Sequence, residues 1–309
     1  MNGEKRRPTI GRRAAAFTLV EIMVVMVLLS VIILGLVAMF DQTQKAFRAG
    51  MAQTDQLEGG RMLTDLLQRD LEQVTPSYQT NGVNFYAQIP DYPLLRQILP
   101  ASTIPRTNIL ENLFFLSRYN QTWSGIGYCV RTNMYFGLTG NMSPVGTLYR
   151  FQTNVTVSQF NGNGMLPYLT FLAATNQGSF SKVIDGVVDF RVRCYDTNGT
   201  LLVGDNAPFL VGNDLMTNSS FTAITNSAVI APGEVESYAF SNNIVPAYVE
   251  VQVGVLEPSV LKRYNSIPSP ITRSNFLANH AGNVQLFRQR ITIRNVDPCA
   301  YTTNNCSSF

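Results

Sequence analysis

The chain has 309 residues, of which 45% are apolar and 14% charged, so it is too hydrophobic for a disordered chain and long enough to bury a core in one or two domains. Five of the 23 basic residues lie in residues 1–16 beside Glu4 alone, and the rest holds 18 basic and 19 acidic residues. A near-neutral body lacks the basic surface that nucleic acid requires, so we expect no nucleic-acid partner for it.

Residues 17–40 form an apolar run in which Glu21 is the only charged residue. As a helix the run is about 36 Å long, enough to cross a hydrocarbon core of about 30 Å. The basic residues before it are expected to hold that end in the cytoplasm, which makes the chain a single-pass membrane protein with an exported body.

Three ordinary kinds of targeting or anchoring segment are alternative interpretations of this region. A cleavable secretory signal has its small residues after the apolar run, whereas Ala14, Ala15 and Ala16 precede it. Twin-arginine export rests only on the pair Arg12–Arg13, which is common in basic leaders. A plain uncleaved anchor explains the charge and the length but leaves Glu21 unexplained.

Glu21 is the most informative residue of the run. A charged side chain within a span costs about 2.5–3.5 kcal/mol on insertion scales. Either Glu21 lies close enough to the interface to reach water, or it pairs with a cation that is itself in the membrane. Cleavage between Ala16 and Phe17 would supply that cation, because Phe17 would then carry a free amine.

The basic leader, the small residue Ala16 and the sequence FTLVE at the start of an apolar helix resemble the type IV prepilin signal. The resemblance implies that prepilin peptidase cuts between Ala16 and Phe17 and methylates the new amine of Phe17. It implies that Glu21 pairs with a neighbouring subunit during filament assembly. The sequence departs from the prepilin pattern in two ways. Ala16 replaces the Gly that usually precedes the cut, and the span contains Gly35 but lacks the proline that is common in the family.

Residues 41–75 are expected to continue the helix in amphipathic form. Leucines recur at helical spacing from Leu63 to Leu71, and Arg61, Asp65 and Arg69 alternate in sign along another face. We expect Gly50 and the pair Gly59–Gly60 to be bends, and Pro76 to end the pattern.

From Pro76 onward the sequence favours short strands separated by Asn, Thr, Ser and Gly. Residues 247–256 place Ala247 and four valines on one face, with Glu250 and Gln252 on the other. Residues 187–203 predict a strand with Val188, Phe190, Val192 and Cys194 inward and Asp189, Arg191 and Arg193 outward, followed by a turn at 196–199 and a return strand. Residues 286–295 alternate again, with Phe287, Ile291 and Ile293 apolar.

The predicted fold is therefore α+β, a pilin-like lollipop in which a long N-terminal helix packs on a mainly antiparallel β-sheet head. Its predicted parts are a basic leader at 1–16, a membrane-spanning and assembly half of the helix at 17–40, an amphipathic half at 41–75 and an exported head at 76–309. Within the head, RMLTDLLQRDLEQV, GYCVRTN, GTLYRF, VIDGVVDFRVRCYD and FRQRITIRN resemble, in order, segments of J-type minor pseudopilins of type II secretion and of W-type minor pilins.

Residues that commonly carry catalysis are scarce. His280 is the only histidine, so a multi-histidine metal site is excluded, and no nucleophile-elbow, phosphate-loop, HExxH or CxxC motif occurs. The sequence DTNG at 196–199 lacks the later ligands of a calcium loop and predicts a turn. Trp123 and most of the other aromatic residues are expected in the core. We expect no enzyme activity, cofactor or metal.

The four cysteines lie on the predicted exported side, where disulfides form. Four cysteines allow three pairings. Cys299 with Cys306 is the first choice because the two are close in sequence. Cys129 with Cys194 would then join two strands, and the alternative is a pair of buried free thiols.

The resemblance implies a structural subunit that assembles with other pseudopilin or pilin subunits through an inner-membrane platform. A J-type subunit belongs to a periplasmic pseudopilus that exports folded proteins, and a W-type subunit to an extracellular pilus used in adhesion, motility or DNA uptake. The rival class is a membrane-anchored periplasmic enzyme or binding protein.

Overall fold

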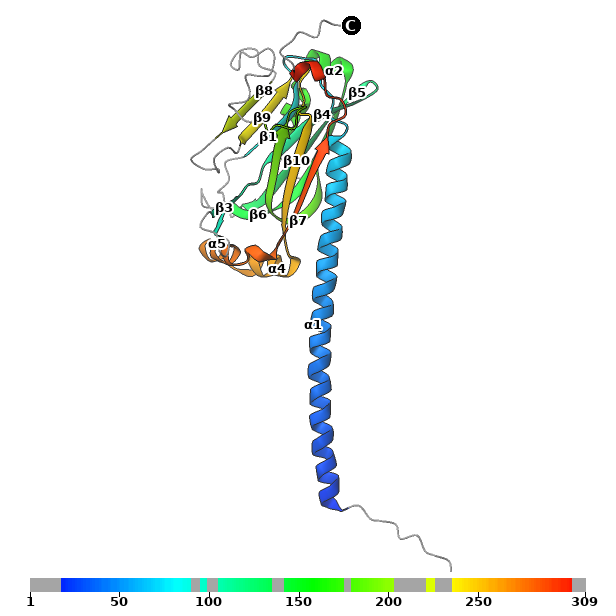
Figure 1. Ribbon diagram of the computed structural model, residues 1–309, viewed down its shortest axis with the longest axis vertical. Coiled ribbons are helices and arrows are strands. Elements are labelled where there is room, and N and C mark those ends of the chain that lie inside the picture. The colour runs from blue at the N-terminus through cyan, green and yellow to red at the C-terminus, as the bar shows by residue number, and fades with distance from the viewer. Residues whose placement is uncertain are drawn as a thin grey trace, which may run out of the picture. The chain divides into compact units, whose positions relative to one another are not determined.

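The computed structural model describes residues 18–89, 95–98, 105–134, 142–174, 179–202, 221–225 and 235–301 (Figure 1). The chain divides into two compact units, Met1–Met51 and Ala52–Phe309. The fold is α+β, with a long N-terminal helix followed by an antiparallel β-sheet domain, as the sequence predicts.

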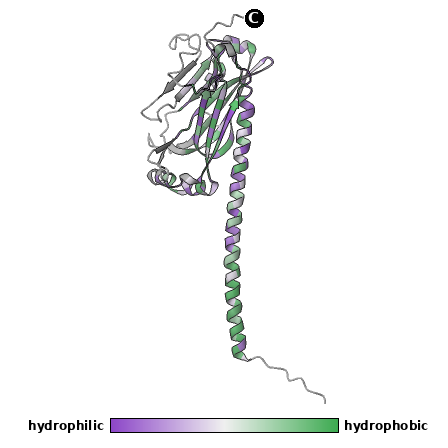
Figure 2. Cartoon of the chain, in the orientation of Figure 1, coloured by the Kyte–Doolittle hydropathy of each residue, from purple (hydrophilic) through white to green (hydrophobic). Residues whose placement is uncertain are grey.

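Helix α1 spans Leu19–Leu71 and contains 53 residues. Figure 2 shows that its first half is hydrophobic and that hydrophilic residues enter its second half. The helix runs without interruption through Gly50, Gly59 and Gly60, and bends at these glycines stay a prediction. Gly60 serves packing, because a Cβ atom there would lie 1.9 Å from Cζ of Phe287.

The β-sheet domain is built on one nine-stranded sheet among the described residues. Its order is β11-β10-β7-β6-β5-β4-β1-β9-β8, and each neighbouring pair is antiparallel, while β2 and β3 form a separate pair. The strands are β1 Val83–Gln88, β2 Leu95–Ile98, β3 Pro105–Asn108, β4 Asn112–Tyr119, β5 Thr122–Met134, β6 Met142–Thr156, β7 Phe180–Tyr195, β8 Phe221–Thr225, β9 Val235–Ser241, β10 Tyr248–Leu256 and β11 Val284–Thr292.

In the parts of the chain that the structure describes, four short helices accompany the sheet, and the sequence patterns indicated none of them. Pro167 and Pro258 lie in the first turn of α3 and α4, where a missing N–H costs nothing. The helices are α2 Val157–Gly162, α3 Leu166–Ala173, α4 Pro258–Ser266 and α5 Pro270–Asn279, with 3₁₀ turns at Ala281–Asn283 and Pro298–Tyr301.

The sheet carries a hydrophobic cluster on each face. Alternate residues of β4 enter opposite clusters: Leu113 and Phe115 join the cluster that includes Leu63, Leu67 and Leu71 of α1. Phe114 and Leu116 join a second, aromatic-rich cluster, whose other members include Trp123, Phe160, Tyr168, Phe171 and Phe180. The second half of α1 therefore covers one face, and α2 and α3 cover the other. Trp123 is a core residue, as predicted.

The predicted strand at 247–256 is confirmed, with Ala247 and the four valines buried. The facing predicted for β7 is wrong at Val188, because Val188 is the extra residue of a bulge where the register with β10 shifts between Gly254 and Val255. Val188 joins a small cluster with α4 and α5 rather than the main core. Asp189 lies on the face opposite to Phe190, as predicted, but it is buried there and accepts the N–H of Ile109 at 2.9 Å.

The predicted turn at 196–199 is also confirmed. Oδ1 of Asp196 accepts the N–H groups of Asn198 and Thr200 at 2.9 and 2.7 Å, and Gly199 has φ +80°. The return strand is reduced to an isolated bridge between Tyr195 and Leu201 within the described residues. In β11, Ile291 and the following Ile293 are buried, and Phe287 packs on the main core.

Candidate functional site

The first turn of α1 contains the predicted assembly carboxylate. Thr18 precedes the helix, and its Oγ1 accepts the N–H of Glu21 at 3.3 Å. This is N-capping, in which a hydroxyl satisfies one of the free N–H groups at a helix start. The order Thr-x-x-Glu matches the capping-box pattern. Thr18 is a residue that our sequence reading missed, although this four-residue pattern signals it.

Glu21 and the apolar residues after it are all exposed in the isolated chain. Eighteen large apolar side chains between Leu19 and Phe40 are at least 49% exposed, and by length and composition the helix can cross a membrane. A water-soluble surface does not tolerate so large an apolar area. This segment therefore requires a lipid or a protein environment. Ala16 and Phe17, the predicted processing residues, lie outside the described residues.

The second half of α1 is fixed to the sheet by a buried polar contact as well as by leucines. Asp70 is 3% exposed and lies in the last turn of the helix. Its Oδ2 accepts a hydrogen bond from the Tyr128 hydroxyl of β5 at 2.7 Å and from Nε of Arg150 of β6 at 2.6 Å. A buried carboxylate is tolerated when it is paired in this way.

The electrostatics of this contact follow from its burial. Burial raises the pKa of the Tyr128 hydroxyl, and the negative charge of Asp70 raises it further. Burial lowers the pKa of Arg150, but the hydrogen bond and the charge of Asp70 outweigh it, so the pKa is raised. Tyr128 therefore stays neutral and Arg150 stays charged, which keeps the pair complementary to the carboxylate.

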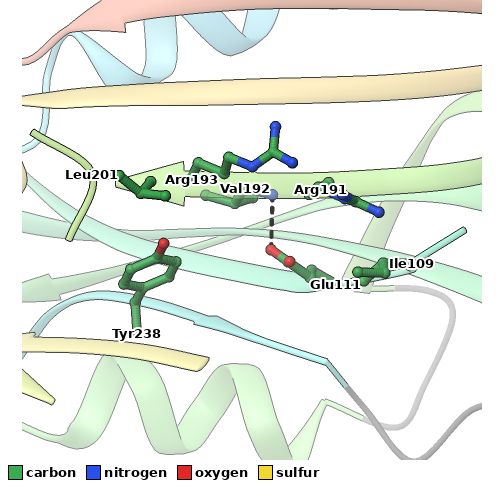
Figure 3. Close-up of a pocket in the computed structure, with 7 residues that line it drawn as sticks. All are labelled: Ile109, Glu111, Arg191, Val192, Arg193, Leu201 and Tyr238. Carbon is green, nitrogen blue, oxygen red and sulfur yellow. Dashed lines mark hydrogen bonds between the residues drawn. The ribbon is translucent and has the colours of Figure 1, made fainter. Parts of the chain in front are cut away.

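A small cavity lies where β7 passes the segment before β4 (Figure 3). Its lining includes Glu111, which points toward β7 and accepts the N–H of Val192 at 2.8 Å. The cavity has room for about one water molecule, so it is too small for a substrate or cofactor. The carboxylate of Glu111 instead takes the place of a strand carbonyl as the acceptor for a backbone N–H of β7.

The remaining candidates have structural roles. Nδ1 of His280 lies 2.7 Å from the carbonyl oxygen of Phe276, and the two rings stack at 3.9 Å. No group of three or more His, Cys, Asp or Glu side chains able to hold a metal occurs among the described residues.

The pairing of Cys129 with Cys194 is not formed, and the alternative of buried free thiols is observed. The strand β6 separates their strands, and the two side chains enter clusters on opposite faces of the sheet, so no disulfide can join them. Burial raises the pKa of both thiols, which keeps them protonated and unreactive. The pairing of Cys299 with Cys306 lies outside the described residues.

The comparisons with known proteins concern the N-terminal segment. The prokaryotic N-terminal methylation motif matches residues 11–37. No curated protein and no solved structure matches the chain. The motif and the apolar helix with Glu21 in its first turn make the chain a type IV prepilin-like protein. A prepilin motif implies processing by prepilin peptidase and assembly with other pilins in the membrane. The J-type or W-type resemblance of the head stays a prediction.

Proposed function

We propose that the chain is a minor pseudopilin-like structural subunit of a type II secretion pseudopilus, cut before Phe17, N-methylated there and assembled through the first half of α1. The head is periplasmic and the leader cytoplasmic before assembly. The observation that carries the proposal is an exposed apolar helix with one carboxylate, Glu21, in its first turn. The methylation motif at residues 11–37 supports the same reading.

The helix supplies the membrane affinity of the subunit and the register of its assembly. Burial of apolar surface contributes about 25 cal/mol per Å² removed from water, but lipid and neighbouring helices both provide an apolar environment. The apolar run is therefore stable both in lipid and among neighbouring helices, and it does not favour one axial offset between those helices over another. Glu21 selects one axial position of the helix relative to its neighbours. An unpaired carboxylate is costly in an apolar environment, and the amine of Phe17 on a neighbouring subunit relieves that cost.

The head is carried by the helix rather than loosely tethered to it. Leu63, Leu67 and Leu71 are at most 1% exposed beneath the sheet, and Asp70 is held by two strands. A displacement of this part of α1 is therefore transmitted to the whole sheet domain. Such a subunit can move its head by moving its helix, as a filament driven by an external motor requires.

The proposal is tested by changing Glu21. Glu21→Ala and Glu21→Gln should insert in the membrane and be processed, yet fail to enter filaments, because both lose the charge that pairs with the amine. Leu36→Ala, a change at an exposed position of the same helix, is the control and should assemble. Normal incorporation of both Glu21 variants would contradict the assembly role.

The choice of a secretion pseudopilus rests on the resemblance of five head segments to J-type subunits, and a type IV pilus is the alternative machine. Deleting the gene should abolish export of folded proteins to the medium and leave pilus retraction intact. Loss of motility or DNA uptake with normal protein export would select the pilus. A tethered enzyme or binding protein would require neither machine.

A further inference from the structure

Three neighbouring strands carry a line of charged side chains on one face of the sheet. Arg193 of β7, Glu250 of β10 and Arg290 of β11 lie directly beside one another in the strand register. Nη1 of Arg193 and Nη2 of Arg288 donate to the two carboxylate oxygens of Glu250 at 3.2 and 2.8 Å. These contacts make one continuous patch. We call it the arginine face, and it comprises Arg193, Tyr195, Tyr248, Glu250, Leu286, Arg288 and Arg290.

The arginine face presents positive charge to its surroundings. The side chain of Glu250 is 9% exposed beneath its two arginines, whereas that of Arg288 is 57% exposed. Arg290 is exposed as well, and its Cζ lies 4.3 and 4.6 Å from the ring centroids of Tyr195 and Tyr248. Such cation–π contacts hold a guanidinium in place without neutralising it. The face continues along β7 with one charge of each sign, Arg191 and the buried Asp189.

A second charged surface, of opposite sign, lies on the second half of α1. Its residues are three or four positions apart, so they share one side of the helix, and all of them are exposed. None of its three carboxylates forms an ion pair with another described residue. Arg61 is the one basic residue between positions 52 and 65. We call this surface the acidic stripe, and it comprises Asp55, Glu58, Met62 and Asp65.

The two surfaces are complementary in chemistry. Each combines one exposed apolar side chain with charges of a single sign. Leu286, 39% exposed, is next on its side of β11 to Arg288, and Met62, 68% exposed, lies between Glu58 and Asp65. Opposite charges steer two surfaces together and fix their register, while contact of the apolar side chains removes them from water. Nucleic acid or anionic lipid would match the arginine face alone, whereas a second copy of the chain matches both surfaces.

The two surfaces lie on opposite sides of the sheet domain. Val192, Val249 and Ile291 alternate along their strands with residues of the arginine face, and they pack with Leu63 and Leu67 of α1 in the main core. The arginine face is therefore on the side of the sheet that α1 does not cover. Two copies related by a twofold axis cannot exchange both contacts. A contact between these surfaces is head-to-tail, and it repeats from copy to copy.

We infer that the arginine face of one copy binds the acidic stripe of a second copy of this chain. This inference rests on the proposed function and deepens it, because it names a surface through which neighbouring heads contact one another in addition to the apolar half of α1. The apolar half provides the membrane affinity, and the contact between heads adds a directional interaction outside the apolar segment.

The first test is crosslinking of the full chain in membranes of its own cells. A photo-crosslinking amino acid replaces Met62 in one copy, and a second copy carries an affinity tag. We expect a crosslinked pair whose attachment point on the tagged copy lies at 193–195, 248–250 or 286–290. The same amino acid at Tyr119, 78% exposed on the β4–β5 turn, is the control and should not reach these residues.

The second test reverses the charges. The stripe variant, Glu58→Arg with Asp65→Arg, and the face variant, Arg290→Glu, should each lower the yield of the pair about fivefold, since exposed ion pairs contribute up to about 1 kcal/mol each. Gln121→Glu, an exposed change on the β4–β5 turn, should leave the yield unchanged. A stripe variant with the crosslinker at position 62 should recover the yield when the tagged copy is the face variant. Recovery requires both variants to be folded.

Every other result overturns the inference. Crosslinks from position 62 only to lipid, only to other proteins or to other parts of the second copy would do so. Unchanged yields in both charge variants, or no recovery in the mixed pair, would do so as well. The leader separates the two proposals: an intact leader on the wild-type chain contradicts the proposed function, whereas a processed chain without the crosslinked pair contradicts this contact alone.

Discussion

The carboxylate of Asp70 in the last turn of α1 accepts the hydroxyl hydrogen of Tyr128 in β5 at 2.7 Å, across 58 positions of the sequence. Arg150 of β6 reaches the same oxygen at 2.6 Å. This contact joins the end of α1 to the centre of the sheet by directional hydrogen bonds. The leucines around it supply the burial, and Asp70 adds hydrogen bonds to two neighbouring strands.

Removing the charge of Asp70 should destabilise the sheet domain. Asp70→Asn leaves Arg150 partly buried without its carboxylate, and breaking one partner of a buried pair costs about 3–5 kcal/mol. Tyr128→Phe keeps the ion pair and should cost about 1–3 kcal/mol. Urea unfolding followed by fluorescence of Trp123, the only tryptophan and 4% exposed, measures both. Asp65→Asn, at an exposed position of the same helix, is the control; equal stability of D70N and D65N would contradict the anchoring role.

Gly60 and Gly50 should respond to alanine in opposite directions. Alanine favours a helix over glycine by about 1 kcal/mol, so Gly50→Ala, with nothing within 4 Å of the new Cβ, should strengthen the helix. Gly60→Ala drives a Cβ into the Phe287 ring and should cost about 1–3 kcal/mol instead. Thermal unfolding of the two variants provides the comparison. The additional change Phe287→Ala should reduce the harm of G60A, and its failure to do so would refute the steric explanation.

Thr18 should determine where α1 begins. Thr18→Ala removes the hydroxyl that accepts the N–H of Glu21 and should weaken the first turn by about 1 kcal/mol, whereas Thr18→Ser keeps the cap. Hydrogen exchange of the Glu21 amide in detergent micelles reports the cap directly. Exchange in T18A should be several-fold faster than in wild type and T18S. Identical protection in all three would show that the cap does not form.

The stability of the sheet should fall in acid partly through Glu250. Although burial raises the pKa of this carboxyl, hydrogen bonds from Arg288 at 2.8 Å and Arg193 at 3.2 Å outweigh it and lower the pKa. A carboxyl whose pKa is lower in the folded state stabilises that state above its unfolded pKa of 4.5. This stabilisation is lost as the pH falls through the lower folded value.

Unfolding of wild type and Glu250→Gln across this range is the measurement. The stability advantage of the wild type should be greatest above pH 5 and should shrink below the unfolded pKa of 4.5. Glu257→Gln, at the residue that follows the end of β10, is the comparison variant. An advantage of wild type over E250Q that stays constant as the medium is acidified would contradict the linkage.

Much of the fold could be predicted from local patterns. The apolar run at 17–40, the helical spacing of leucines after it and the stop at Pro76 specified one helix, and strict alternation specified β10, because these signals are local in the sequence. The burial of Asp189 could not be predicted, since it depends on the approach of Ile109, whose N–H it accepts and which is 80 positions away in the chain. The role of Gly60 likewise depends on Phe287, which is 227 positions later in the chain.

The candidate site divides in the same way. Glu21 stood out because a charge in an apolar run is costly wherever the chain folds. Asp70 did not, because it lies among ten charged residues between Asp41 and Gln73 and nothing local distinguishes it from its exposed neighbours. Only the approach of β5 and β6 makes its carboxylate different. The sequence left open whether Cys129 and Cys194 form a disulfide for the same reason. The face of the sheet that each cysteine occupies is a property of the whole sheet.

The first residue of the protein isolated from its own cells tests the central claim most directly. Mass spectrometry of the N-terminal peptide should find a chain that starts at Phe17 and carries one methyl group on its amine. A chain that begins at Met1 in assembled material would leave Glu21 without its partner, and one that begins beyond residue 40 would lack Glu21 altogether; either result would contradict the account.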